Sequence, residues 1–241
     1  MQAVSNRTKI VNWLMPLLLV VVVALLSAVV ARAVAVATVH EALTQAGAGI
    51  PSGAANNAAP ALGTIDPSQV TIRPANRLGS PNAPVTIVEY SDFRCSFCEK
   101  VEREAVAQLR ATYVPSQTVA IVYKHAAILG AESTWAAQAA ECAADQDQFW
   151  AYHDLLFARQ NGENQGTFTK ANLLGLAREL KLDISRFEPC LMNDQTLARV
   201  QADVVEAQAL GVTGTPIFFI NGQPLIGAQP LSKFEELIAA Q

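Results

Sequence analysis

Residues 85–98 of this chain read Val85-Thr86-Ile87-Val88-Glu89-Tyr90-Ser91-Asp92-Phe93-Arg94-Cys95-Ser96-Phe97-Cys98. The first six residues are rich in β-branched types and predict a strand. From Cys95 to Tyr113 the pattern predicts a helix, which Pro115 ends. Two cysteines three positions apart therefore lie where a strand passes into a helix.

This position favours redox chemistry for the cysteine pair. At a helix N-terminus the free N–H groups and the helix dipole stabilise a thiolate, so we expect Cys95 to be the reactive thiol. Cys98 lies one turn further on and is close enough to form and resolve a disulfide with Cys95. A zinc site and a purely structural bridge are the alternatives. No second Cys or His pair has metal-ligand spacing, so no metal site is predicted.

Two further segments bear on this site. Glu89 is in phase with Val85 and Ile87, which predicts either a buried acid or a residue on a half-exposed strand. Thr215-Pro216 precedes the β-rich residues 217–220, and a cis bond there would present backbone opposite the cysteines.

The remaining elements follow from periodicity and turn residues. Residues 119–123 predict a second strand, and about four helical segments are expected between residues 132 and 210. Residues 217–220 and 224–226 predict a hairpin around Asn221-Gly222, followed by a helix from Leu231. In the helix after Cys95, we expect Glu102, Arg103 and Glu104 to lie away from the apolar face. The order predicts a small mixed sheet packed by helices.

Residues 85–98 and 211–222 resemble the active-site and cis-proline segments of the DsbA-like thioredoxin-fold family. The resemblance extends from Ile72 to Gln241. It implies an α/β thioredoxin fold with a helical insertion at about residues 130–210. It also implies the following roles: Cys95 as nucleophile, Cys98 as resolving thiol, Thr215 and Pro216 as a cis pair that binds substrate, and Glu89 as the buried acid that assists proton transfer. Separately, Lys124 at the end of the next strand is expected to pair with Glu89.

The dipeptide between the cysteines departs from known family members. Ser96-Phe97 is neither the Pro-His of DsbA nor the Gly-Pro of thioredoxin, so the direction of catalysis stays open. Arg94 is expected to be a solvated surface residue, with a positive charge near Cys95 as the alternative.

Cys142 and Cys190 form a second pair within the expected insertion. Some members of the family resemble this chain in having such a pair joined as a structural disulfide. Free thiols and a second redox relay are the alternatives. The aromatic residues around Cys142 are expected to pack a core rather than line a substrate groove.

The N-terminal segment predicts where in the cell the protein is located. Residues 13–31 carry no charge and would form a helix about 28 Å long, close to the thickness of a bilayer core. Arg7 and Lys9 precede it, so the N-terminus is expected in the cytoplasm and the remainder outside. We therefore predict a signal anchor within residues 1–40, a flexible linker over 41–69 and a domain over 70–241. Cleavage as a secretory signal is the alternative, which would give a secreted or periplasmic protein.

The net charge of the chain bears on the kinds of partner that it can bind. Residues 1–40 hold three of the 17 basic residues and none of the 21 acids, so 14 basic and 21 acidic residues give the remainder a formal charge of −7. This argues against nucleic-acid binding. The sequence predicts a membrane-tethered monomer without a cofactor that donates its Cys95–Cys98 disulfide to reduced exported proteins. The resemblance implies a quinone-linked membrane protein as reoxidant. A disulfide reductase or isomerase, and a thioredoxin-fold binding module, are the alternatives.

Overall fold

The sheet has two parallel central strands. A computed structural model describes residues 62–162 and 165–241 of the chain. In it β2 (Val85–Ser91) pairs in parallel with β3 (Val119–His125). The strand order is β1-β3-β2-β4-β5, with β1 (Arg77–Leu78), β4 (Ile217–Ile220) and β5 (Gln223–Ile226) joined antiparallel. The mixed sheet predicted from the sequence is confirmed. Helices cover both faces, so β2 and β3 are buried along almost their whole length, including the polar Glu89, Lys124 and His125.

The C-terminal hairpin shows why the sequence requires Asn221-Gly222. Both residues have positive φ, 44° and 88°, as a two-residue turn between twisted strands requires. A Cβ on Gly222 would also lie 2.2 Å from the carbonyl oxygen of Ile65. The amide of Ile65 donates to the carbonyl oxygen of Gly222 at 2.9 Å, and Ile65 is buried in the core, so this turn also holds residues 62–70 against the domain. The flexible linker predicted over 41–69 is therefore wrong for residues 62–69.

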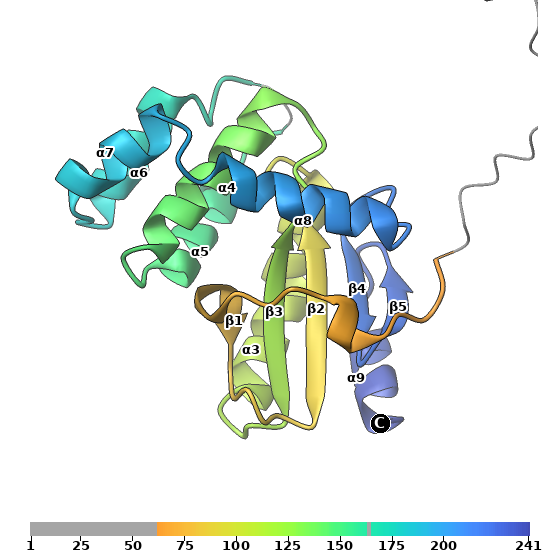
Figure 1. Ribbon diagram of the computed structural model, residues 1–241. Helices are drawn as coiled ribbons and strands as arrows, with labels where there is room; N and C mark the ends of the chain where they lie inside the picture. Colours follow the sequence, from red (N-terminus) through yellow and green to blue (C-terminus); the bar gives the residue numbers. More distant parts are fainter. Residues whose placement is uncertain (1–61, 163–164) are drawn as a thin grey trace, which may run out of the picture. The chain divides into compact units, whose positions relative to one another are not determined.

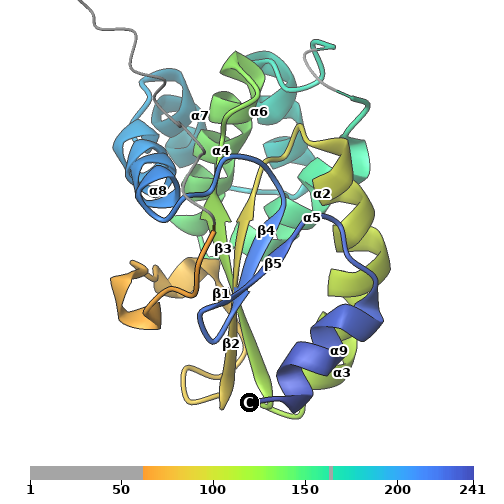
Figure 2. The ribbon, with the colours of Figure 1, turned by 90° about the vertical axis from the view of Figure 1, so that its right-hand side faces the viewer.

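Helices cover both faces of the sheet (Figure 2). On one face Val101, Leu109 and Phe234 pack against the strands. They belong to α2 (Ser96–Val101), α3 (Ala107–Tyr113) and α9 (Leu231–Ala239), and a π-helical turn, η3 (Glu102–Val106), joins α2 to α3. On the other face α8 (Leu197–Ala209) packs through Ala207, beside residues 62–72. The 310 turns η1 (Pro67–Gln69) and η2 (Pro74–Asn76) lie in the segment leading to β1.

The insertion between β3 and β4 is a group of helices at one end of the sheet (Figure 1). Its core is continuous with the active-site segment, because Phe93, Cys98 and Tyr123 belong to the same cluster of buried residues. The insertion contains α4 (Ala131–Ala144), α5 (Phe149–Arg159), α6 (Lys170–Glu179) and α7 (Ile184–Met192), and α8 completes it. Phe149 and Tyr152 are buried there, which confirms core packing for the aromatic stretch. Residues 131–209 contain five helices, α4 to α8, whereas the periodicity predicts about four.

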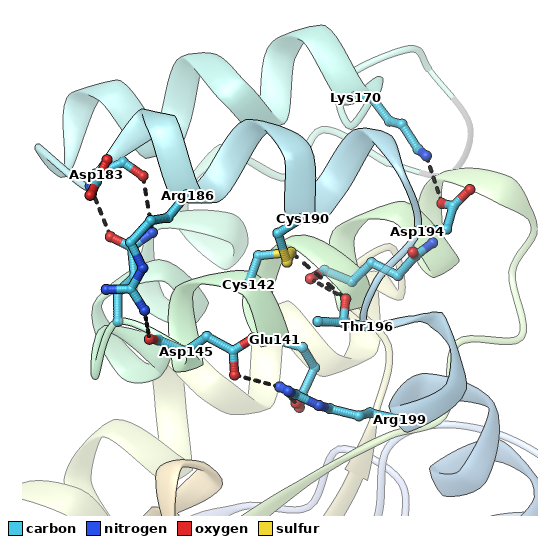
Figure 3. The surroundings of a disulfide bond; sticks show 12 residues. Glu141, Cys142, Asp145, Lys170, Asp183, Arg186, Cys190, Asp194, Thr196 and Arg199 are labelled. Carbon is cyan, nitrogen blue, oxygen red and sulfur yellow. Dashed lines mark hydrogen bonds and ion pairs between the residues drawn. A yellow bond between two sulfur atoms is a disulfide. The ribbon is translucent and has the colours of Figure 1, made fainter.

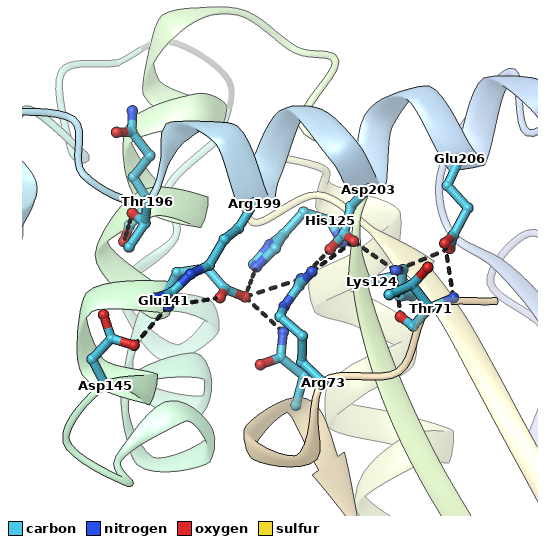
Figure 4. A network of polar contacts seen from close by, with 12 residues as sticks. Thr71, Arg73, Lys124, His125, Glu141, Asp145, Thr196, Arg199, Asp203 and Glu206 are labelled. Atoms are coloured by element: carbon cyan, nitrogen blue, oxygen red, sulfur yellow. Dashed lines mark hydrogen bonds and ion pairs between the residues drawn. The ribbon is translucent and has the colours of Figure 1, made fainter.

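The side chain of Lys124 projects from one face of the sheet, and the side chain of Glu89 projects from the other. The Nζ of Lys124 is 2.6 Å from Asp203 Oδ1 and 2.9 Å from Glu206 Oε1, both on α8 (Figure 4). In the parallel register Glu89 is opposite Tyr123, and side chains of a strand alternate between the faces. The predicted Glu89–Lys124 pair is therefore wrong.

The predicted membrane segment lies outside the described residues. Within residues 62–162 and 165–241, no helix has the length and apolar character needed to cross a bilayer.

Candidate active site

Cys95 lies at the N-terminus of α2, where β2 ends. It is the N-cap residue of the helix and is 6% exposed. Its Sγ contacts the carbonyl oxygen of Thr215 at 3.4 Å. A hydrogen bond from the Cys98 thiol, outweighing partial burial, lowers the pKa of Cys95 to about 6, and the N–H groups of Cys98 and Phe97 contribute. Cys95 is thus largely a thiolate at neutral pH, as the thiol of an exchange reaction must be.

Cys98 differs from Cys95 in exposure and in acidity. It is fully buried one turn along α2, and burial raises its pKa well above the usual range of a thiol. The structure contains both cysteines as free thiols. Cys95 is therefore the thiol that can attack, whereas Cys98 stays protonated until a base removes its proton.

The residues predicted to bind substrate lie opposite this pair. The Thr215-Pro216 bond is cis and places the carbonyl group of Thr215 against Cys95. The carbonyl oxygen of Pro216 accepts from Gly227 N at 2.9 Å, beyond the end of β5. The β4–β5 hairpin thus positions this segment.

Two side chains that sequence reasoning missed hold the turn between β2 and α2. Asp92 accepts from the N–H of Arg94 at 2.8 Å, and from the N–H groups of Ile128 and Leu129 at 2.9 and 3.1 Å. Gln160, at the end of α5, donates to the carbonyl oxygens of Phe93 and Cys95 at 2.7 and 3.0 Å. Asp92 carries a local signal, since Asp often bonds the N–H two residues on. Gln160 carries none, because its partners are more than 60 residues away.

Glu89 is fully buried on β2, as one of the two sequence interpretations expects. Burial raises its pKa well above that of an ordinary glutamate, and the nearby carboxyl of Glu102 adds to the effect. Glu102 itself is only 6% exposed, so its predicted place on the solvent side of the helix is wrong. It follows Cys98 by four positions, and its N–H bonds the carbonyl oxygen of Cys98, so both face the sheet.

Arg94 is also buried, contrary to its expected place in solvent. The insertion covers it: its guanidinium lies 5.1 Å from the ring centre of Phe168. Its Nε is 3.8 Å from Glu132 Oε2, and Glu132 also accepts from the N–H groups of Gly166 and Phe168. The sequence could not show this, because the covering residues lie in a different part of the chain.

Cys142 and Cys190 form a disulfide between α4 and α7 (Figure 3). Cys142 is buried, and the hydroxyl of Thr196 lies 3.8 Å from its Sγ. The bond closes 48 positions of chain and ties the first helix of the insertion to the fourth.

The arrangement is that of a thioredoxin-fold domain with a redox-competent C-x-x-C site. Residues 73–240 match the family model described as thioredoxin. The chain belongs to the thioredoxin family and, within it, to the DsbA-like group.

Known proteins of two kinds are similar to this chain. A probable disulfide bond formation protein D from Bacillus anthracis is 30% identical over 149 residues, which cover 60% of this chain and 69% of that protein. The oxidised form of BdbD from Bacillus subtilis matches with a TM-score of 0.66 and 23% identity, covering 74% of this chain and 95% of that one.

The other kind is a much longer protein. A Na(+)/H(+) antiporter, NhaA 1, from Salinispora arenicola is 38% identical over 161 residues. The match takes in 66% of this chain but spans only 22% of the antiporter's length.

Proposed function

We propose that this protein is an extracytoplasmic thiol-disulfide oxidoreductase that donates the Cys95–Cys98 disulfide to reduced exported proteins. The observation that carries the proposal is the contrast between the two thiols: the pKa of Cys95 is lowered to about 6, mainly by the hydrogen bond from Cys98, whereas burial raises the pKa of Cys98. The name of the Bacillus anthracis relative, a probable disulfide bond formation protein, supports the same chemistry.

The reaction follows from the geometry. A substrate thiolate attacks Sγ of Cys95, the Cys95–Cys98 bond breaks, and Cys98 takes up a proton. A second substrate thiolate then attacks the substrate sulfur of the mixed disulfide and releases the Cys95 thiolate. Two electrons pass from the substrate to the protein. Phe97, 64% exposed beside Cys95, offers an apolar contact to an unfolded chain, and Thr215-Pro216 docks its backbone.

The thiolate favours the oxidising direction because it stabilises the reduced form. A pKa lowered from 9.0 to about 6 contributes at most about 1.4 kcal/mol at pH 7, or about 30 mV, before screening by water. This is about a fifth of the roughly 150 mV between thioredoxin and DsbA. A reductase would use the same residues in the opposite direction. The reduction potential of the Cys95/Cys98 couple therefore distinguishes a reductase from an oxidase.

Location and partners belong to the same proposal. We infer that residues 1–40 anchor the domain to the membrane, that the part of the predicted linker before residue 62 tethers it, and that the domain acts outside the cytoplasm. Residues 62–69 belong with the domain, because Ile65 packs and hydrogen-bonds against it. The Cys142–Cys190 bond supports the extracytoplasmic location because disulfides persist in oxidising compartments. We propose that a quinone-linked membrane protein reoxidises the Cys95/Cys98 pair.

The decisive experiment equilibrates the domain with glutathione buffers and measures the Cys95/Cys98 potential. A value above about −230 mV supports disulfide donation, and a lower value supports a reductase. Oxidative refolding of a reduced protein then tests the roles of the thiols. Cys95→Ser should abolish turnover, and full activity in that variant would overturn the assignment.

A further inference from the structure

The chain contains two Asn-Gly pairs, Asn161-Gly162 and Asn221-Gly222, and the fold restrains only one of them. An asparagine before a glycine is open to a reaction that needs no enzyme, in which the glycine nitrogen attacks the side-chain carbonyl carbon of the asparagine. Glycine permits this attack because it has no Cβ and adopts a wide range of backbone angles. In a folded protein the reaction depends on whether the two reacting atoms can meet.

The side chain of Asn221 is fixed at both of its polar atoms. Its Oδ1 accepts from the N–H of Thr86 at 2.8 Å, and its Nδ2 donates to the carbonyl oxygen of Pro84 at 3.0 Å. The neighbouring Gly222 is itself held, because its carbonyl oxygen accepts from the N–H of Ile65 at 2.9 Å. Attack on Asn221 would require these bonds to break and the β4–β5 turn to change shape, so the fold protects this pair.

Asn161 and Gly162 lie in the connection between α5 and α6 and lack these restraints. Asn161 is exposed. Among the residues that the structure describes, none accepts a hydrogen bond from Nδ2 of Asn161 or from the N–H of Gly162. Gly162 has a φ of 98°, and a Cβ placed on it would meet no heavy atom within 4 Å. The attacking nitrogen and the leaving amide of this pair are therefore both unhindered.

The one hydrogen bond of the Asn161 side chain within the described residues favours the reaction. The hydroxyl of Thr167 donates to Oδ1 of Asn161. Attack by the Gly162 nitrogen places negative charge on this oxygen in a tetrahedral intermediate, and a donor already aimed at the oxygen stabilises that charge. The pair thus combines a free nucleophile, a polarised carbonyl group and an unbonded leaving group.

We propose that Asn161 is a self-deamidation site, which converts to aspartate and isoaspartate with the assistance of Thr167. The Gly162 nitrogen loses its proton to solvent and attacks Cγ of Asn161. The new C–N bond closes a succinimide ring, and Nδ2 leaves as ammonia. Water then opens the ring at either carbonyl carbon and leaves one carboxylate. One water is consumed, one ammonia is released and no electrons move, so the proposal is independent of the disulfide-exchange function.

The product places a negative charge next to the active-site turn. Gln160 precedes Asn161 in the chain, and its amide donates to the carbonyl oxygens of Phe93 and Cys95 at 2.7 and 3.0 Å. A carboxylate at position 161 disfavours the Cys95 thiolate, so we expect deamidation to make Cys95 less acidic. The modification therefore links the age of a molecule to the reactivity of its thiol.

The first test follows both Asn-Gly pairs by peptide mass mapping while the protein is incubated at pH 8. In urea the two pairs share the same local chemistry and should deamidate at similar rates. In the folded protein Asn161 should react at least about tenfold faster than Asn221, because a misplacement of the reacting atoms by about 1 Å costs a larger factor. A smaller ratio, or a folded rate at Asn161 more than about tenfold below its rate in urea, would overturn the site.

Variants of Thr167 test the assisting hydrogen bond. Thr167→Val keeps the shape of the side chain without its donor and should slow deamidation at Asn161 at least about threefold, the effect of one exposed hydrogen bond. The rate at Asn221 should not change in this variant. Thr167→Ser keeps the hydroxyl and should react as wild type does. An unchanged rate at Asn161 in Thr167→Val would overturn the role of Thr167.

The link to the thiol is tested with Asn161→Asp, which carries the charge from the start. The pH midpoint of Cys95 alkylation by iodoacetamide should rise by about 0.2–0.7 pH unit, the range for an exposed charge, and high salt should reverse the rise. Asn193→Asp makes the same change at an exposed position at the end of α7 and should leave the midpoint unchanged. A midpoint that does not move in Asn161→Asp would overturn the link to Cys95.

Discussion

The Sγ of Cys95 lies 3.4 Å from the carbonyl oxygen of Thr215, a residue 120 positions further along the chain. Strand β4, which pairs with β2 in antiparallel register, carries that carbonyl to the nucleophile. The Cys95 thiol donates to this carbonyl, whereas the Cys98 thiol, the side chain of Thr215 and the N–H groups of Cys98 and Phe97 lower the pKa of Cys95. The groups that contact Cys95 therefore come from its own helix and from a second segment held by the sheet.

The first prediction concerns the acidity of Cys95. The hydrogen bond from Cys98 is the largest cause of its low pKa, so Cys98→Ala should raise that pKa by about one to two units. Cys98→Ser keeps a donor and should leave the pKa near its wild-type value. The pH dependence of iodoacetamide alkylation gives the midpoint directly. Wild-type alkylation with a midpoint near pH 9 would contradict the thiolate.

The second prediction concerns Glu89 and stability. Its pKa in the folded protein is raised above the unfolded value, so its contribution is most favourable at low pH and is lost as pH rises through the folded pKa. Glu89→Gln removes this dependence. The free energy of unfolding of the variant relative to wild type should increase by at least about 1.4 kcal/mol from pH 4 to pH 8. Urea unfolding at both pH values measures it, with Glu104→Gln as the exposed control. A difference independent of pH would show that Glu89 is not held protonated.

The third prediction concerns Asp203, which accepts from Arg73 and pairs with Lys124 (Figure 4). Although burial opposes ionisation, these cations and His125 lower its pKa below the usual value. Its stabilising contribution is therefore present above the unfolded pKa and lost as pH falls through the folded one. Asp203→Asn should cost about 3–5 kcal/mol at pH 7, because it leaves buried Lys124 without a full partner. The loss should shrink towards pH 3.

Glu236→Gln is the matched control for Asp203. It breaks an exposed ion pair with Lys233 and should cost less than about 1 kcal/mol. Equal losses in the two variants would argue that the buried network contributes no more than a surface pair.

The fourth prediction concerns the Cys142–Cys190 disulfide. Closing 48 positions of chain should stabilise the fold by about 4 kcal/mol in the loop-entropy model. A double Ala variant should lose about that much in urea unfolding under oxidising conditions. Full reduction of the wild type should reproduce the loss, and Cys95 should keep its alkylation rate in the variant. A slower rate would instead connect this disulfide to the reactive site.

Local pattern was sufficient for much of the fold. The β-branched residues of β2, the cysteine pair at the start of α2 and the Asn221-Gly222 turn each depend on neighbours in sequence. The resemblance to the DsbA-like family then supplied the insertion and the second cysteine pair. Asn221 and Gly222 adopt the positive φ values that the hairpin requires.

Predictions failed where the partner of a side chain lies in another element. Lys124 has the right charge for Glu89 but projects from the opposite face of the sheet, where α8 supplies two carboxylates. Arg94 follows a strand as a surface residue would, yet the insertion buries it. The spacing of Cys98 and Glu102, four apart on one helix, was the available signal that Glu102 faces inward.

The sequence by itself determined which residues could react, because a thiol at a strand-to-helix junction and an acid in an apolar strand are local features. Only the tertiary structure decided what surrounds them: the Thr215 carbonyl at Cys95, the Gln160 amide on the active-site turn and the Glu102 carboxyl at Glu89. These contacts join distant segments, and burial gives them their effect on proton affinity. A pKa depends on the dielectric and the charges within a few ångströms, which only the packed chain brings together.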